Sequence, residues 1–442
     1  MTLAEMRRDA LECWRAAVDA VNPGRLVTAR LCRRDDTLCL GAPGAGVTAR
    51  HAGPVLVVGA GKAARGMAEA AARAAGAALR GGIMIVPHGS DLLPIGGVAI
   101  AAGAHPVPDA AGEAATRQLL EAVAAADGST LVLVVLAGGA SALLVAPALG
   151  LDLRDKQEVT RGLLAAGADI VALNTVRKHC SREKGGGLLR AAARAAGVWT
   201  LLLSDVVGDD PATIGSGPTV ADPTTFADAA GVLTRFLAPE DVPPAVRRHV
   251  ERGVGGRVPE TVKPGDPVLL QTRTVVVGGN RDAVGAAARA AERRGYSTTV
   301  LPEAFSGDAA GAGRAIVARL AASPRDRPQA IVAGGETTVR VVPDGRGGRC
   351  QQLALAAAIA LAGEPAVLLA AGTDGVDGPT DAAGACVDGE TAERARARGF
   401  DPEAGLARTD SHPLLEAAGD LVRTGPTGTN VADVVVALRA AC

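Results

Sequence analysis

The stretch Thr130–Leu151 reads TLVLVVLAGGASALLVAPALGL and contains 22 residues without a charge. That length would suffice for a helix that crosses a bilayer. Its first part, however, is rich in the aliphatic and β-branched residues of a buried strand, and the run breaks at the turn AGGAS. A buried parallel strand, a glycine turn and the start of an apolar helix therefore explain the stretch better than a membrane span.

The same alternation extends outward from this stretch in both directions. Short runs of Val, Ile and Leu precede Ala-rich segments such as AARGMAEAAARAAGAAL and RDAVGAAARAAERRG, which are typical of helices. Such alternation predicts βαβ units with a mostly parallel sheet, and so the α/β fold class.

The size of the chain favours two domains over one, since 442 residues with 48% hydrophobic composition can bury more than one core. The stretch 239–267 is rich in proline, glycine and charge and lacks a strong apolar period, so we expect it to lie in the connection. We predict an N-terminal domain over residues 1–240, a connection over residues 241–272 and a C-terminal domain over residues 273–442.

The composition argues against several classes of partner. The 46 basic and 47 acidic residues give a net charge of -1, and aromatic residues make up only 2% of the chain. We therefore expect neither nucleic-acid nor membrane binding. The seven cysteines form no CxxC pair, and the start MTLAEMRRDALECW has charges where a signal peptide would need an apolar core. These features predict a cytoplasmic protein with reduced thiols.

Six predicted strands end in turns rich in glycine or carboxylates. In chain order they read VLVVGAGK, LVLVVLAGGAS, WTLLLSDVVGDD, TVVVGGNRD, AIVAGGETT and AVLLAAGTDG. Ligands of open α/β sheets bind beyond the carboxyl ends of the strands, so we expect these turns to face one cleft. For any single turn, the alternative that glycine only closes a tight strand-to-helix connection is equally good.

The first of these turns carries Lys62. Gly59, Gly61 and Ala64 have the G-x-G-x-x-A spacing of a dinucleotide-binding loop, but the next strand ends in Pro87 where that motif needs an acidic residue for the ribose. The frame of a Walker A loop is also missing. Lys62 at a helix N-terminus remains a candidate site for a phosphate or carboxylate, with a solvated surface lysine as the alternative.

Two further segments concentrate charge. NTVRKHCSREKGGGLL contains Arg177, Lys178 and Lys184, which either contact an anion or form a solvated helix face. SDVVGDD places Asp205 at a strand end and Asp210 in the loop that follows. A carboxylate in that place often holds Mg²⁺, and the alternative is turn formation and capping.

Near the C-terminus, Arg349 follows a glycine-rich turn and precedes an apolar helix, while Glu336 ends another strand. The histidines have no metal-ligand spacing and no G-x-S-x-G motif occurs, so zinc hydrolysis and α/β-hydrolase chemistry lack support. Cations, carboxylates and glycines together suit phosphoryl transfer, in which the protein positions the reactants and neutralises charge.

The loop AGTDGVDGPTDAAGA contains three aspartates, but their spacing and the alanine at position 385 do not fit an EF-hand. We expect Asp374 to lie at the mouth of the cleft and to face the substrate or a metal. Asp377 and Asp381 are expected to be structural, because DGPTD is typical of a turn.

Several strings, in this order, closely resemble the glycerate 2-kinase family, whose C-terminal part is the MOFRL domain. They are GAGKAA, HPVPDAAG, NTVRKHCSREKGGGL, SDVVGDDPATIGSGPT, GGETTV, GGRCQQLAL, AGTDGVDGPTDAAGA and GPTGTNVAD, and they run from about Val55 to Asp433. The resemblance implies a Rossmann-like N-terminal domain, a smaller α/β C-terminal domain and an active site in the cleft between them. It also implies ATP-dependent phosphorylation of D-glycerate to 2-phosphoglycerate with Mg²⁺ or another divalent cation.

Three motifs depart from the family pattern. This chain has LAGGAS where the family usually reads S-G-G-G-S, Cys350 and Gln352 where it has Asn and Glu, and NVAD where it has N-V-N-D. The second departure removes an amide and a charge beside Arg349, which bears on substrate preference more than on reaction class.

The family's catalytic lysine and arginine match Lys62 and Arg349, and we add Asp205 as a third catalytic candidate. The candidates for binding substrate or ATP are Gly59, Gly61, Gly138, Gly139, Ser141, Arg177, Lys178, Lys184, Asn280, Glu336 and Asp374. The metal candidates are Asp205, Asp210 and Asp374. A nicotinamide-dependent hydroxypyruvate reductase and a non-catalytic binding protein for small acids stay open as alternatives, as does a homodimer.

Overall fold

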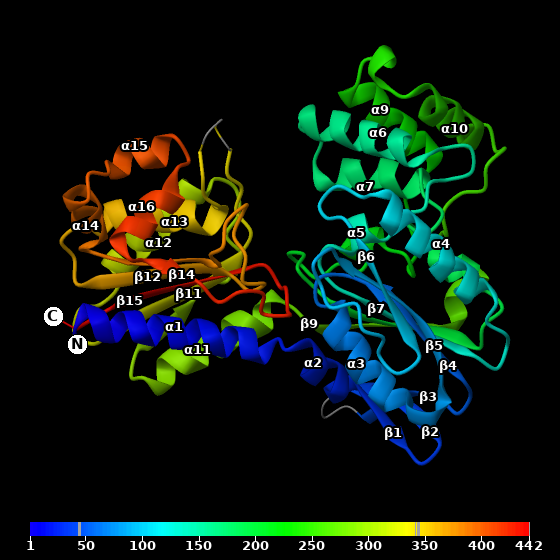
Figure 1. Cartoon of the computed structure of the whole chain (residues 1–442), viewed down its shortest axis with the longest axis horizontal. Coiled ribbons are helices and arrows are strands. Elements are labelled where there is room, and N and C mark those ends of the chain that lie inside the picture. The colour runs from blue at the N-terminus through cyan, green and yellow to red at the C-terminus, as the bar shows by residue number, and fades with distance from the viewer. Residues whose placement is uncertain (43–45, 341, 343–344, 442) are drawn as a thin grey trace. The chain divides into compact units, whose positions relative to one another are not determined.

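The computed structural model describes residues 1–42, 46–340, 342 and 345–441 (Figure 1). The chain divides into two compact units, and each is described by itself. Unit 1 comprises Met1–Asn22, Asp205–Val207 and Gly278–Cys442, and unit 2 comprises Pro23–Ser204 and Gly208–Val277. The bounds differ from those expected from the sequence, for reasons that the packing of each unit explains.

Unit 2 is built on a six-stranded sheet with the strand order β6-β5-β4-β7-β8-β9. The pairs β4–β5, β4–β7, β5–β6 and β7–β8 are all parallel, which confirms the parallel sheet expected here. The strands are β4 (Val55–Ala60), β5 (Leu79–Pro87), β6 (Val98–Gly103), β7 (Leu131–Leu136), β8 (Gly197–Leu203) and β9 (Thr272–Gly278).

The stretch 130–151 contains strand β7, the glycine turn and the short helix α5 (Ala140–Leu143), as its sequence predicts. Every residue of β7 is buried, and β4 and β8 pair with it on either side. Among the helices of the described residues, none combines the length and the apolar character that crossing a bilayer requires.

The helices of unit 2 form two groups. Helices α3 and α4 pack on the sheet, whereas α6, α7, α9 and α10 pack on one another around an apolar core of their own (Figure 1). These helices are α3 (Ala64–Ala75), α4 (Ala110–Ala124), α6 (Leu153–Ala165), α7 (Ile170–His179), α9 (Phe226–Phe236) and α10 (Pro244–Val254). The rest of the unit includes α2 (Pro23–Arg30), α8 (Gly187–Ala191) and a small antiparallel sheet of β1 (Leu31–Arg34), β2 (Thr37–Ala42) and β3 (Gly46–His51).

The residues expected to connect the two domains are part of unit 2. Helix α10 packs on α9 through buried residues that include Val246 and Val250, and β9 forms the edge of the sheet. One of the prolines that suggested a connection has another cause, because Pro244 is the first residue of α10, where its missing N–H costs nothing. The boundary between the units lies at Val277 and Gly278 instead.

Unit 1 contains a second six-stranded sheet with the order β10-β11-β15-β12-β13-β14. Only β10 and β11 pair in parallel, and the other pairs are antiparallel, so the mostly parallel sheet expected for the whole chain is wrong for this half. Two of the antiparallel pairs involve β15, which lies between β11 and β12, and the other two join β12 to β13 and β13 to β14. The strands are β10 (Ser297–Val300), β11 (Gln329–Gly335), β12 (Ala366–Gly372), β13 (Gly384–Asp388), β14 (Leu421–Val422) and β15 (Asp433–Arg439).

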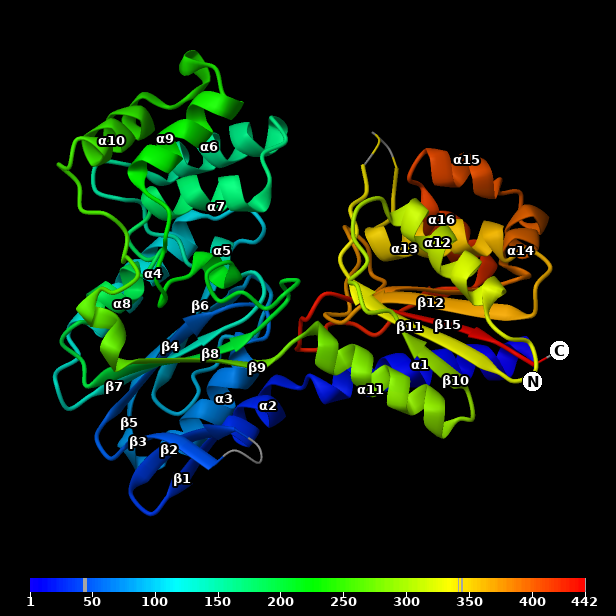
Figure 2. The same ribbon diagram turned by 180° about the vertical axis from the view of Figure 1, so that it is seen from behind.

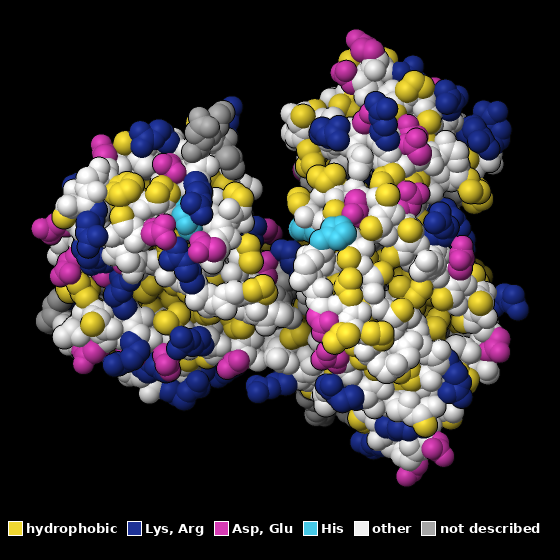
Figure 3. All heavy atoms as spheres, in the orientation of Figure 1, with side chains coloured by type: hydrophobic (Ala, Val, Ile, Leu, Met, Phe, Trp, Pro, Cys, Tyr) yellow, Lys and Arg dark blue, Asp and Glu magenta, His cyan; other side chains and the backbone are white. Residues whose placement is uncertain are grey.

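Helices cover both faces of this sheet (Figures 1 and 2). Helices α12 and α13 pack together on one face, and α1 and α11 pack together on the other. Their bounds are α1 (Leu3–Ala20), α11 (Asn280–Arg293), α12 (Ala309–Ala322) and α13 (Arg349–Ala360), and α14 (Thr391–Ala397), α15 (Pro402–Ala407) and α16 (Ser411–Ala418) follow β13. On the face drawn in Figure 3, basic and acidic side chains are interspersed over each unit, in keeping with a net charge of -1.

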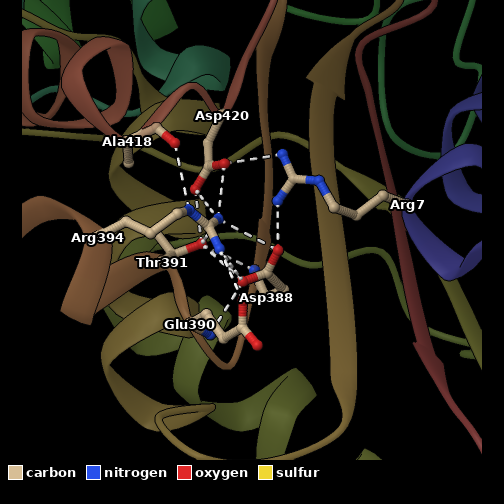
Figure 4. Close-up of polar contacts among 7 residues, drawn as sticks. All are labelled: Arg7, Asp388, Glu390, Thr391, Arg394, Ala418 and Asp420. Carbon is tan, nitrogen blue, oxygen red and sulfur yellow. Dashed lines mark hydrogen bonds and ion pairs between the residues drawn. The ribbon is translucent and has the colours of Figure 1, made fainter. Parts of the chain in front are cut away.

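The first helix belongs to unit 1 and not to the N-terminal domain expected over residues 1–240. Arg7 binds Asp388 at 2.6 Å and Asp420 at 2.7 Å, and Arg394 binds the same two carboxylates from the other side (Figure 4). Trp14 is buried against the sheet and donates its indole N–H to the carbonyl oxygen of Ala371. Helix α1 is therefore joined to unit 1 by contacts with residues almost a whole chain length away, which no local sequence pattern reveals.

Candidate active site

The loop that carries Lys62 is shaped by two glycines. Gly59 and Gly61 lie where β4 approaches β7 so closely that a Cβ on Gly59 would stand 1.8 Å from the carbonyl oxygen of Val135, and one on Gly61 would stand 2.6 Å from that of Ala137. Both residues have positive φ, of 158° and 138°. Backbone packing therefore accounts for these two glycines, which sequence reasoning assigned to ligand binding.

Lys62 lies beside the loop that follows β7. Its backbone N–H donates to the carbonyl oxygen of Gly138 at 2.8 Å, and a Cβ on Gly139 would lie 3.5 Å from Cγ of Lys62. The same position would lie 3.1 Å from Cδ2 of His105. The structure thus brings Lys62, Gly138 and Gly139 together and adds His105, which the sequence reasoning missed although HPVPDAAG contains it.

Basic residues at and after the end of α7 donate hydrogen bonds to the chain that follows β7. Lys184 donates to the carbonyl oxygens of Ser141 at 3.0 Å and Leu144 at 2.7 Å, and Arg177 donates to that of Ser141 at 3.0 Å. Burial lowers the pKa of Lys184 to about 7, although the neighbouring Glu183 opposes that shift. These contacts favour a supporting role for Arg177 and Lys184.

Lys178 and Ser141 are also engaged within unit 2. Lys178 is buried and forms an ion pair with Asp222 at 3.3 Å. Burial would raise the pKa of Asp222, but the charge of Lys178 and hydrogen bonds to the carboxylate outweigh it and lower that pKa. The Ser141 hydroxyl is 2.7 Å from that of Ser216. Lys178 is thus buried and paired within unit 2.

A second polar centre lies in unit 1, at the start of β15. Asp433 stands in register with Gly335, the last residue of β11, and with Gly372, the last residue of β12. The carboxyl ends of β11 and β12 therefore meet at Asp433, which is 1% exposed. Sequence reasoning did not select Asp433, although it ends the string GPTGTNVAD.

Arg349 is bound to this aspartate at two points. Its Nε lies 2.6 Å from Oδ2 of Asp433 and its Nη2 lies 2.9 Å from Oδ1, while Nη1 binds Glu336. Burial alone would lower the pKa of Arg349, but the hydrogen bonds and charge of Asp433 raise it above its ordinary value. Such a two-point pair fixes the plane of the guanidinium group as well as its position.

Asp377 secures the helix that begins at Arg349. The N-cap position of α13 is Gly348, which has no side chain to cap the helix. Asp377 takes that role from the acidic loop, since its oxygens accept the N–H groups of Cys350 at 3.0 Å and Gln351 at 2.8 Å. Asp381 binds Arg423 at 2.8 Å. Both aspartates are thus structural, as the turn-like sequence predicts.

The other predicted residues of unit 1 gather around the same strand ends. Asn280 donates to the carbonyl oxygens of Val431 at 2.8 Å and Asp433 at 3.0 Å, so it holds the segment that leads into β15. Asp205 accepts a hydrogen bond of 3.2 Å from Asn430 in that segment. Asn430 is a second residue that sequence reasoning missed.

The three predicted metal ligands come from different parts of the chain. Asp205 and Asp374 belong to unit 1, and Asp210 belongs to unit 2. Both oxygens of Asp210 accept hydrogen bonds within its own loop, from Ala212 N–H and the Thr213 hydroxyl, which indicates turn formation. Within residues 1–42, 46–340, 342 and 345–441, no group of three or more His, Cys, Asp or Glu is arranged to hold an ion.

Comparisons with known proteins agree on the family. Residues 9–251 match the family described as a domain of unknown function (DUF4147), and residues 329–433 match the MOFRL family. A relative from Agrobacterium vitis, provisionally named a hydroxypyruvate reductase, is 43% identical, and the match covers 87% of each chain. The glycerate 2-kinase of Pyrococcus horikoshii is 36% identical, with 99% of this chain and 98% of the relative covered.

A solved structure gives the same result at the level of the fold. The crystal structure of a glycerate kinase from Thermotoga maritima matches with a TM-score of 0.83 and 35% identity, and the match covers 99% of this chain and all of the other. The sequence match and the structural match thus both extend over nearly the whole chain, and the MOFRL match lies in its C-terminal part, as the resemblance implies. The chain belongs to the glycerate kinase family.

Proposed function

We propose that the protein transfers the γ-phosphoryl group of ATP to the 2-hydroxyl of D-glycerate, giving 2-phosphoglycerate and ADP. The observation that carries this proposal is the fixed guanidinium group of Arg349, which Asp433 and Glu336 hold at the carboxyl ends of β11 and β12. A planar cation suits the carboxylate of glycerate or a phosphoryl group, both of which it can bind at two points.

The reaction needs little covalent chemistry from the protein. The 2-hydroxyl oxygen attacks the γ-phosphorus, the bond from that phosphorus to ADP breaks, and the hydroxyl proton passes to a carboxylate. Asp205 and Asp374 are our candidates for that carboxylate. Lys62 and Arg349, each from its own unit, neutralise the negative charge of the reactants.

A divalent cation fits the carboxylates of unit 1. Oδ1 of Asp374 and Oδ1 of Asp433 lie 3.2 Å and 3.5 Å from the place where a Cβ on Gly372 would stand, so two carboxylate oxygens lie close to this glycine. Mg²⁺ typically takes one or two protein carboxylates together with phosphate oxygens. We propose Asp374 and Asp205 as the residues that would hold Mg²⁺, which would neutralise charge on the transferred group.

The alternative of a nicotinamide-dependent reductase rests on the glycine spacing at residues 59–64 and on the names of two relatives. A dinucleotide-binding loop needs backbone N–H groups that point at the pyrophosphate. Here Gly61 donates its N–H to Ile85 and Lys62 donates its N–H to Gly138. The loop therefore favours the kinase over the reductase.

The experiment compares Lys62→Ala and Arg349→Ala with two control variants at exposed arginines, Arg73→Ala on α3 and Arg314→Ala on α12. Glycerate-dependent release of ADP should fall at least about 100-fold in the first two variants, because charge stabilisation in the transition state is lost. It should stay unchanged in the controls. Near-normal turnover in folded Arg349→Ala, or oxidation of NADH with hydroxypyruvate by the unmodified protein, would refute the proposal.

A further inference from the structure

A cavity of about 470 Å³ lies in the helical part of unit 2. Its walls come from the end of α7, from α8, from α10 and from the chain that follows α10, which runs past α8 in Figure 2. None of the residues around Lys62 described above lines it: Gly59, Gly61, His105, Gly138 and Gly139 all lie elsewhere. The volume is within the range of small-molecule sites.

Four arginines line this cavity: Arg182, Arg190, Arg252 and Arg257. Across the part of the chain that the structure describes, no carboxylate forms an ion pair with any of the four. Among their side chains in that part, only that of Arg190 donates a hydrogen bond, to the carbonyl oxygen of Glu260. Four unneutralised guanidinium groups around one cavity repel one another and attract an anion. Arginine binds phosphate at two points, so a phosphoryl group is the anion that this arrangement suits best.

Glu260 is the single carboxylate among the described residues that line the cavity, and other residues compensate its negative charge. Glu260 pairs with Lys263 at 3.1 Å, and its Oε2 lies 3.2 Å from Nε2 of His179. Its other oxygen accepts the backbone N–H of Phe226. The pKa of Glu260 lies below its ordinary value because these contacts outweigh burial, so its charge is already compensated locally.

The cavity also has an apolar side and an unused polar atom. Phe226, Val258 and Leu149 line it, and Leu149 is 81% exposed. His249 is 94% buried, and its Nδ1 has no hydrogen-bond partner among the described residues, whereas its Nε2 binds the carbonyl oxygen of His179 at 2.9 Å. Inorganic phosphate would leave the apolar side uncovered.

We propose that this cavity binds an organic phosphate, with the phosphoryl group held by the arginines and the carbon skeleton packed against Phe226, Val258 and Leu149. The site is separate from the Lys62 loop but physically connected to it. Lys184 lines the cavity and also holds the carbonyl oxygens of Ser141 and Leu144. The proposal does not depend on the identity of the phosphoryl acceptor.

The test titrates phenyl phosphate and inorganic phosphate into the full-length protein by calorimetry. Phenyl phosphate should bind at least about 10-fold more tightly than inorganic phosphate. Arg252→Ala/Arg257→Ala should weaken its binding at least about 10-fold, because two guanidinium groups proposed to pair with the phosphoryl group are removed. Arg248→Ala, an exposed α10 residue outside the cavity, is the matched control and should bind like the unmodified protein.

Lys62→Ala separates this site from the catalytic one. Binding of phenyl phosphate should persist in Lys62→Ala, and all variants should unfold at the temperature of the unmodified protein, since the replaced arginines are exposed. Binding that is lost in Lys62→Ala and kept in the double variant would belong to the catalytic site and overturn the proposal. Equal affinity for the two phosphates would overturn the role of the apolar side, and no binding of either would overturn the site itself.

Discussion

Arg349 and Asp433 form a two-point ion pair at the place where the carboxyl ends of β11 and β12 meet the start of β15. The residues are 84 positions apart in sequence, and each comes from a different structural element. Asp433 is buried, whereas Arg349 is partly exposed, so the aspartate can orient the guanidinium group while one side of that group stays open to a ligand.

Asp433→Asn should lower turnover at least about 10-fold and destabilise the protein by about 3 kcal/mol, because it removes the buried carboxylate that binds Arg349 at two points. Steady-state kinetics and urea unfolding measure the two effects. The matched control is Asp326→Asn, whose carboxylate is 69% exposed. Unchanged kinetics in folded Asp433→Asn would mean that Asp433 does not position Arg349.

Asp377→Ala should lower the free energy of unfolding by about 2 kcal/mol, because the N–H groups of Cys350 and Gln351 lose their acceptor in a buried place. Asp381→Ala, in the same loop, should change it by less than about 1 kcal/mol, because its ion pair with Arg423 is exposed. Equal costs for the two variants, measured by urea unfolding, would contradict the capping role of Asp377.

Gly59→Ala should prevent stable folding or cost more than about 3 kcal/mol, because the new Cβ would collide with a backbone carbonyl of the adjacent strand. Gly231→Ala, on the exposed face of α9 with open space around it, should instead stabilise the protein by up to about 1 kcal/mol. Thermal unfolding of the two variants tests this contrast. A stable Gly59→Ala protein would show that β4 and β7 can separate at this point.

The stability of the protein should fall as the pH drops below 6.5, in part because of His249. Burial lowers the pKa of this histidine below its ordinary value of 6.5, and the nearby charge of Arg252 acts in the same direction. Between the two pKa values the unfolded chain binds more protons than the folded one, so acid favours unfolding. His249→Gln keeps a donor for the His179 carbonyl oxygen but cannot titrate.

Urea unfolding at a series of pH values from 5 to 8 compares the two proteins. As the pH falls, the free energy of unfolding of the unmodified protein should decrease more than that of His249→Gln. A difference that stays constant with pH would show that His249 has the same pKa in the folded and unfolded states.

Local sequence patterns predict the parts of this molecule whose causes are local. The run LVLVVL followed by AGGAS predicts β7 and its turn, as the structure confirms. The strand-end positions of Glu336 and Asp374 follow from the same reasoning. In each case the residues that determine the structure are neighbours in the sequence.

Long-range pairing explains what the sequence does not reveal. The residues ADVVVAL are typical of a buried strand, but nothing in them indicates that β15 lies between β11 and β12 and runs antiparallel to both. The position of Asp433 beside Arg349, the cap that Asp377 provides and the attachment of α1 through Arg7 all depend on such pairing. The charged segment at Arg177–Lys184 was expected at a ligand or in solvent, yet its lysines are buried and paired.

Product analysis with D-glycerate and ATP tests the central claim most directly. Phosphorus NMR resolves a phosphate ester at the 2-position from one at the 3-position in the same reaction mixture. We predict 2-phosphoglycerate as the product, formed in step with ADP and lost in Arg349→Ala. Formation of 3-phosphoglycerate, or no phosphorylated glycerate at all from the folded protein, would contradict the proposed function.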